Sequence, residues 1–158
     1  MRRYVVILIL IAAALFTTVA YHLFKPDWVI FRKGEGYFAK KEYSKAIPYY
    51  ARLLKDGFEA PKLLSHFGTS CVATGDFGKA ITIFEDIIKQ SPDKLSAVKE
   101  LANIYVIFGR FKKAVMLYQT FLEDQPDNTY VRILLARALT WSGRFEEAIV
   151  EYKAALGE

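Results

Sequence analysis

The sequence predicts an all-α chain in which an N-terminal transmembrane helix precedes a stack of four helix pairs. Two observations predict this fold class. A short motif returns at one fixed interval, with its alanines at positions 46, 80, 114 and 148, so that each step is 34 residues. A long run near the N-terminus contains no charged residue. A repeat of this period is typical of a stacked array of small helical units and not of one globular core.

The charge-free run extends from Tyr4 to Phe24 and follows Met1-Arg2-Arg3. As a helix, its 21 residues would measure about 31 Å, which matches the hydrocarbon core of a bilayer. We therefore predict that residues 1–26 are a transmembrane anchor. A cleaved signal peptide is the alternative, because the small residues of Thr18-Val19-Ala20 suit a signal peptidase. The apolar run continues past this point, which favours an anchor that is retained.

The positive-inside rule bears on the orientation of this anchor. Arg2 and Arg3 favour a cytoplasmic N-terminus and export of the repeats to the periplasmic side, whereas the lysines and arginines after the run favour the reverse. Long domains translocate largely regardless of charge. We therefore predict the exported orientation and keep the cytoplasmic side as the alternative.

Residues 27–158 have the pattern of paired helices. In the third unit, apolar residues recur at helical spacing around Val98 and Ala102, stop at Gly109, and resume from Ala114. Pro126 then closes the unit, because proline ends a helix. The same pattern places the four units at residues 27–60, 61–94, 95–128 and 129–158.

The third unit carries its small and aromatic residues at defined places, with Ala102 and Tyr105 in the first helix, Ala114 and Tyr118 in the second, and Pro126 at the end. This arrangement resembles the tetratricopeptide repeat, a 34-residue helix–turn–helix. The resemblance covers about 130 residues. It implies a right-handed α-solenoid of four such pairs, which binds protein partners through a concave groove. The first unit departs from the pattern by having Lys41 where the others have glycine.

Close packing of the two helices in each unit explains the small residues, because only small side chains let two helix backbones approach closely. We expect the first-helix positions to meet the second-helix alanines: Gly34, Gly68, Ala102 and Ala136 against Ala46, Ala80, Ala114 and Ala148. We expect four aromatic residues to pack between successive units: Tyr50, Phe84, Tyr118 and Tyr152. Cys71, the only cysteine, is predicted to be a small buried thiol.

Composition and motifs argue against several functions. The formal net charge is +5, but residues 1–26 contribute +3 and residues 27–60 contribute +2, so no repeat carries the basic surface of a nucleic-acid reader. His22 and His66 have no Cys or carboxylate at ligand spacing, which leaves a metal site unsupported. We find no catalytic constellation and expect neither catalysis nor a cofactor.

The resemblance implies that the first helices line the groove. The expected groove residues are those off the packing stripe: Phe31, Glu35, Phe38, Lys62, Thr69, Val72, Lys99, Asn103, Val106, Ile133, Arg137 and Trp141. Their apolar members suit an extended segment or a short amphipathic helix. Lys99, Asn103 and Arg137 offer donors for the partner's backbone or carboxylates.

The last helix carries a stripe of Ile149, Tyr152 and Leu156 that no following helix covers, although repeat arrays normally end in a polar cap. We expect a partner or a second copy of the chain to cover this C-terminal interface. The sequence as a whole predicts a non-enzymatic, membrane-anchored scaffold that binds a partner protein through its groove, within a bacterial envelope assembly complex. A self-associating scaffold that stacks through its last repeat is the alternative, and an enzyme subunit or lipid carrier is a third possibility.

Overall fold

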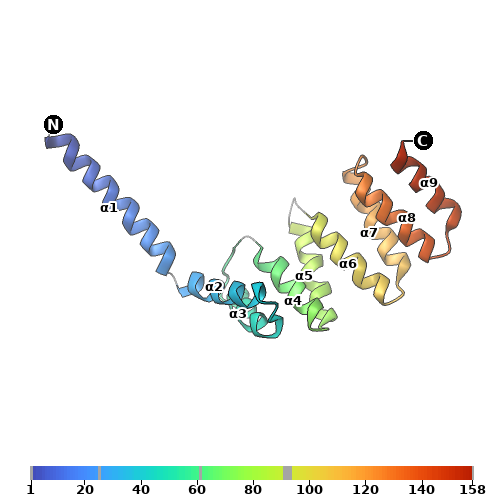
Figure 1. Cartoon of the computed structure of the whole chain (residues 1–158), viewed down its shortest axis with the longest axis horizontal. Coiled ribbons are helices and arrows are strands. Elements are labelled where there is room, and N and C mark those ends of the chain that lie inside the picture. The colour runs from blue at the N-terminus through green and yellow to red at the C-terminus, as the bar shows by residue number, and fades with distance from the viewer. Residues whose placement is uncertain (1, 25, 61, 91–93, 158) are drawn as a thin grey trace. The chain divides into compact units, whose positions relative to one another are not determined.

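The computed structural model describes residues 2–24, 26–60, 62–90 and 94–157, and within these ranges every regular element is an α-helix. This confirms the predicted all-α class (Figure 1). The helices are α1 Arg2–Phe24, α2 Pro26–Ala39, α3 Tyr43–Lys55, α4 Leu63–Ala73, α5 Phe77–Gln90, α6 Leu95–Ile107, α7 Phe111–Asp124, α8 Thr129–Trp141 and α9 Phe145–Leu156.

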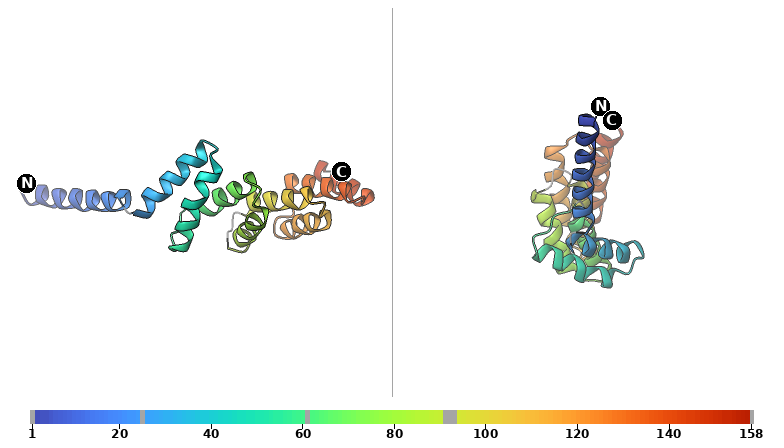
Figure 2. Two further views of the ribbon diagram at one scale, coloured as in Figure 1. Left: turned by 90° about the horizontal axis from the view of Figure 1, so that it is seen from below. Right: turned by 90° about the vertical axis from the view of Figure 1, so that its left-hand side faces the viewer.

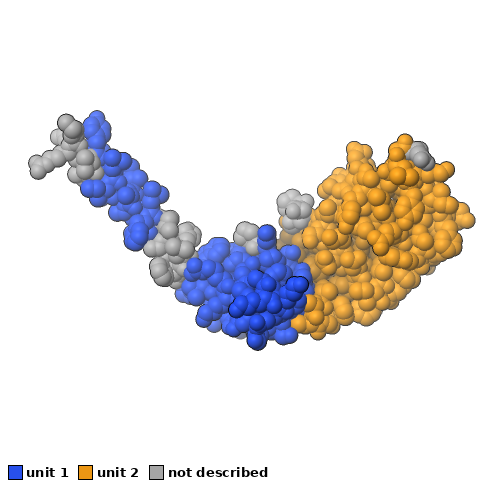
Figure 3. All heavy atoms as spheres, viewed as in Figure 1, with its two compact units in different colours: residues 1–70 blue, residues 71–158 orange. Residues whose placement is uncertain are grey.

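The chain divides into two compact units, Met1–Ser70 and Cys71–Glu158 (Figure 3). In unit 1, α2 packs against α3. In unit 2, each helix from α5 to α9 packs against the next helix in the chain (Figure 2). The helices thus follow one another as the 34-residue period predicts. The exact boundaries of the four repeats stay a prediction.

Glycines occupy the turns that join the two helices of a pair. Gly75, Gly109 and Gly143 have φ values of +80°, +65° and +78°, in the left-handed region that suits a residue without a Cβ. Lys41 holds the same place in the first pair with a φ of 59°. A non-glycine residue in this conformation loses roughly 1–2 kcal/mol, so the first turn is the strained one.

The contact between α2 and α3 confirms that Gly34 must be small. A Cβ built on Gly34 would lie 3.0 Å from Cε1 of Tyr50 and 3.2 Å from Cβ of Tyr49. The nearest atoms therefore belong to these tyrosines and not to Ala46, which was the expected partner. The reason is that the Tyr50 ring and the Tyr49 Cβ both lie closer to Gly34 than the methyl group of Ala46 does.

The core of unit 2 follows the predicted stripe with one exception. Ala102, Ala114 and Ala136 are fully buried, and Tyr118 is 3% exposed. Tyr152, which was expected to pack between repeats, is instead 37% exposed, because no described helix lies over that face of α9. The predicted burial of the only cysteine is confirmed, and that burial raises the pKa of the Cys71 thiol to about 11.

The segment predicted as a membrane anchor forms α1. Its large apolar side chains that the structure describes, among them Tyr4, Ile7 and Phe16, are 51–74% exposed. Among the described residues, however, no helix combines the length and the apolar character that crossing a membrane requires. The structure therefore does not support the predicted transmembrane helix.

Candidate protein-binding surfaces

A hydrogen-bond network links three helices of unit 1. The Glu35 carboxylate accepts a 2.6 Å hydrogen bond from the Tyr50 hydroxyl and lies 2.9 Å from Nδ1 of His66. The Phe38 ring stacks on the His66 ring, with 4.1 Å between centroids. Burial, with a further contribution from Glu35, raises the pKa of Tyr50. Two residues predicted for the groove, Glu35 and Phe38, thus also hold α2, α3 and α4 together.

The sequence analysis treated His66 as having no carboxylate at ligand spacing, whereas the structure places Glu35 beside it. The two residues are 31 positions apart, close to the repeat period of 34. They therefore stand on the first helices of successive repeats, offset by about one helical turn. A search for charged pairs near the repeat period would have found this contact.

The other groove residues of unit 1 are partly covered by their own neighbours. The Phe31 ring lies edge-on to Trp28, with 5.7 Å between centroids, and 6.0 Å from the Phe58 ring. Thr69 is half-buried, and Lys62 is exposed. The aromatic residues at this end of the chain thus pack largely on one another.

In unit 2, the expected groove residues fall on α6 and α8, apart from Val72 on α4. Their spacing is helical: Lys99, Asn103 and Val106 on α6, and Ile133, Arg137 and Trp141 on α8. Asn103 and Arg137 are exposed, and Trp141 is 48% exposed. The Arg137 guanidinium lies 5.2 Å from the centroid of the Trp141 ring. This contact holds the cation near an aromatic surface that remains open to a partner.

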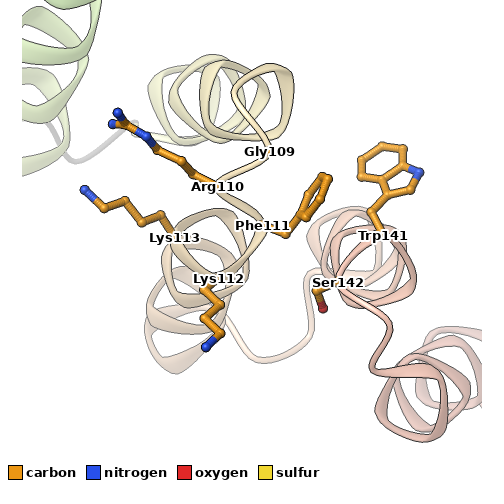
Figure 4. A pocket seen from close by; sticks show the side chains of 7 residues that line it. All are labelled: Gly109, Arg110, Phe111, Lys112, Lys113, Trp141 and Ser142. Carbon is orange, nitrogen blue, oxygen red and sulfur yellow. The ribbon is translucent and has the colours of Figure 1, made fainter.

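A pocket of about 370 Å³ lies between the α6–α7 turn and the end of α8 (Figure 4). It is lined by residues 109–113 with Trp141 and Ser142. The Phe111 and Trp141 rings extend in the same direction, whereas Arg110 and Lys113 extend away from Trp141 (Figure 4). The sequence analysis assigned Trp141 to the groove but gave Phe111 and the cations no binding role. The sequence does contain a signal for such a role, because residues 101–122 include three cationic residues and no Asp or Glu.

Two further hollows lie on unit 2. One of about 560 Å³ is lined by residues of α5, α6 and α7, among them Tyr105 and Met116. The other, of about 500 Å³, includes the ion pair between Arg132 and Glu151, at 2.8 Å. No group of His, Cys, Asp and Glu in the described ranges is arranged to hold a metal ion.

The predicted C-terminal interface lies along α9. Ile149, Tyr152 and Leu156 are 54%, 37% and 75% exposed, so the apolar stripe reaches solvent as expected. That it joins two copies of the chain stays a prediction.

Comparisons with known proteins agree with the all-α repeat fold. A tetratricopeptide repeat family matches residues 105–158. MamA of AMB-1 is 30% identical over 83% of this chain and 72% of its own, with a TM-score of 0.65. MamA of Desulfovibrio magneticus RS-1, from residue 41 onward, is 17% identical over 83% of this chain and 74% of its own, with a TM-score of 0.69, and shows the shared fold alone. A comparison with curated proteins found no match.

Proposed function

Because this chain belongs to the tetratricopeptide-repeat family of which MamA is a member, we propose that it is a non-enzymatic scaffold that holds a protein partner on its first helices. The observation that carries this proposal is the exposed face of α6 and α8. Arg137 offers hydrogen-bond donors there next to the open ring of Trp141, and the exposed Asn103 offers a further donor on α6. Arginine and tryptophan are among the residue types that most often dominate binding once an interface buries them.

Site-specific photocrosslinking in cells that express the full chain tests this face. We expect a crosslinker at Asn103 or at Arg137 to give the same discrete protein adduct, because both side chains face the partner. The matched control is Lys153, which is also exposed on a helix but lies on α9. If all three positions gave the same adduct in equal yield, the proposal that the partner binds through the groove would be contradicted.

The partner is then identified from the adduct, and the double variant N103A/R137A is compared with the unaltered chain and with K153A. We expect binding by the double variant to be at least about tenfold weaker, because each truncated interface residue of this kind removes about 1 kcal/mol or more. The K153A variant should bind as the unaltered chain does.

We also propose that α1 attaches the scaffold to a membrane, with the repeats on the exported side as part of a bacterial envelope complex. The charge-free run from Tyr4 to Phe24 and the exposed apolar side chains of α1 support this proposal. Replacing Ala13 with arginine should release the chain from membranes, because an arginine at the centre of an inserted helix costs about 2.5–3.5 kcal/mol.

The measurement is the fraction of full-length chain that sediments with membranes after carbonate extraction. Ala39→Arg is the matched control, because Ala39 is an exposed alanine at the end of α2. Equal sedimentation of the two variants would argue against membrane attachment through α1. A reporter fused after Glu158 then gives the side of the membrane.

A further inference from the structure

One of the four turns between paired helices differs from the other three in the charge pair at its equivalent positions. In three of them, oppositely charged residues three positions apart form an ion pair: Glu42 with Lys45 at 2.7 Å, Asp76 with Lys79 at 2.9 Å, and Arg144 with Glu147 at 2.5 Å. In the α6–α7 turn, the same two positions are Arg110 and Lys113. This turn therefore carries two cations where the others carry a neutral pair.

The charge at this turn is only partly offset by its surroundings, since Glu85 lines the same hollow as Lys113. Within the described residues, no salt bridge involves Arg110, Lys112 or Lys113. Arg110 lies 5.9 Å from the centroid of the Phe108 ring, and Lys113 lies 5.4 Å from that of Tyr105. The first turn of α7 also has no acidic side chain and no side-chain cap. Like charges three positions apart on a helix destabilise it slightly, so the fold itself gains nothing from this arrangement.

The same turn holds an aromatic slot. Phe111 is half-buried and Trp141 is 48% exposed, and both line the pocket of about 370 Å³. Arg110, Lys112 and Lys113 also line this pocket, and all three stand at the start of α7, on the Phe111 side of the slot (Figure 4). A segment that places a side chain between the two rings would therefore meet positive charge next to Phe111.

We propose that this turn, together with Trp141, binds an acidic segment of a partner protein that carries an aromatic or bulky apolar side chain. That side chain lies between Phe111 and Trp141, and the flanking carboxylates pair with Arg110, Lys112 and Lys113. The inference rests on the proposed scaffold function and states the chemistry of a partner. Complementary charge supports it, because cations without local partners attract an acidic segment and orient it. The slot adds selectivity, since a bare polyanion has no side chain to fill it.

The chain offers its own reporter, because it contains two tryptophans, Trp28 and Trp141. In the full chain carrying W28F, tryptophan emission reports on the slot alone. The probe is a peptide of glutamates around a central phenylalanine, and binding is followed both by this emission and by the anisotropy of a labelled peptide. We expect saturable binding that weakens as salt is raised. A peptide with serine at its centre should bind at least about tenfold more weakly, because it loses the buried ring.

The decisive variant is R110E, which restores to this turn the opposite charges found in the other three. It should keep or raise thermal stability, yet weaken peptide binding by about tenfold or more. Loss of binding in this variant therefore cannot come from unfolding. K153E is the control for the change in net charge and should bind normally. Unchanged binding by R110E would overturn the proposal.

Two more probes separate the acidic segment from other anions. Because α1 is itself proposed to attach to membranes, only the binding that R110E removes is counted for these probes. By this measure, phosphatidylserine vesicles and a single-stranded oligonucleotide should bind no more tightly than the serine-centred peptide, and tighter binding of either would overturn the proposal. The scaffold function is tested separately at Asn103 and Arg137. If N103A/R137A loses the native partner while R110E retains it, the groove proposal stands and this inference fails.

Discussion

Replacing Tyr118 with alanine is expected to lower the free energy of unfolding of unit 2 by about 3–5 kcal/mol, as for other large aromatic residues in cores. Tyr118 lies on α7 and is 3% exposed. Its loss leaves a cavity that α7 and α8 cannot close without moving. Urea denaturation followed by Trp141 emission in the W28F background measures the effect, because Trp141 lies in unit 2.

Tyr118→Phe is the matched control, because it keeps the ring and removes only the hydroxyl. At neutral pH it should change stability by less than about 1.5 kcal/mol. Burial raises the pKa of Tyr118 from 10.0 to about 12, so between these pH values the unfolded chain loses this proton before the folded chain does. Stability should therefore fall as pH rises through this window, and it should fall less steeply in Tyr118→Phe. An equally steep fall in both proteins would contradict the assignment to Tyr118.

Replacing Gly34 with leucine should destabilise unit 1 by about 2–3 kcal/mol. A Cβ at this position already meets the Tyr50 ring at 3.0 Å, and the larger side chain has no room between α2 and α3. The gain in helix propensity over glycine, about 0.8 kcal/mol, offsets only part of this cost. Trp28 emission in a Trp141→Phe background follows the unfolding of unit 1.

Gly36 provides the control, because it lies two positions further along α2 and a Cβ there would meet nothing within 4 Å. Gly36→Leu should therefore stabilise the unit by about 0.8 kcal/mol. If the two substitutions change the free energy of unfolding with opposite signs, the requirement for a small residue is specific to the contact between α2 and α3. If both substitutions destabilised the unit to the same extent, the cause would be a leucine anywhere on α2 and not the close contact at Gly34.

The fold could be predicted from sequence because its period is a direct consequence of packing. Small residues at Ala102 and Ala114, and the left-handed turn at Gly109, are dictated locally and repeat in each pair. The residues that contact Gly34 could not be predicted. The repeat period shows which helices pack together, but it does not show which side chains of α3, such as that of Tyr50, come closest to the glycine. The same limit hid the Glu35–His66 contact, since the two residues stand on different helices.

The candidate binding surfaces were predictable only in part. The resemblance pointed to one face of each first helix, which includes Asn103, Arg137 and Trp141. Phe111 was not predicted as a pocket residue, because a phenylalanine recurs at the same place in the last three repeats, as Phe77, Phe111 and Phe145, and the repeat already accounted for it. The positions at which the repeats differ, such as Arg110 and Lys113, point to candidate binding residues that the shared pattern does not show.

Each helix from α5 to α9 packs on its neighbour in the chain, so most native contacts in unit 2 join residues that are close in sequence. Chains of this kind search little conformational space before contacts form, and they fold fast for their length. Such chains can also gain or lose whole helix pairs without needing a new hydrophobic core, so the length of the repeat array changes easily in evolution.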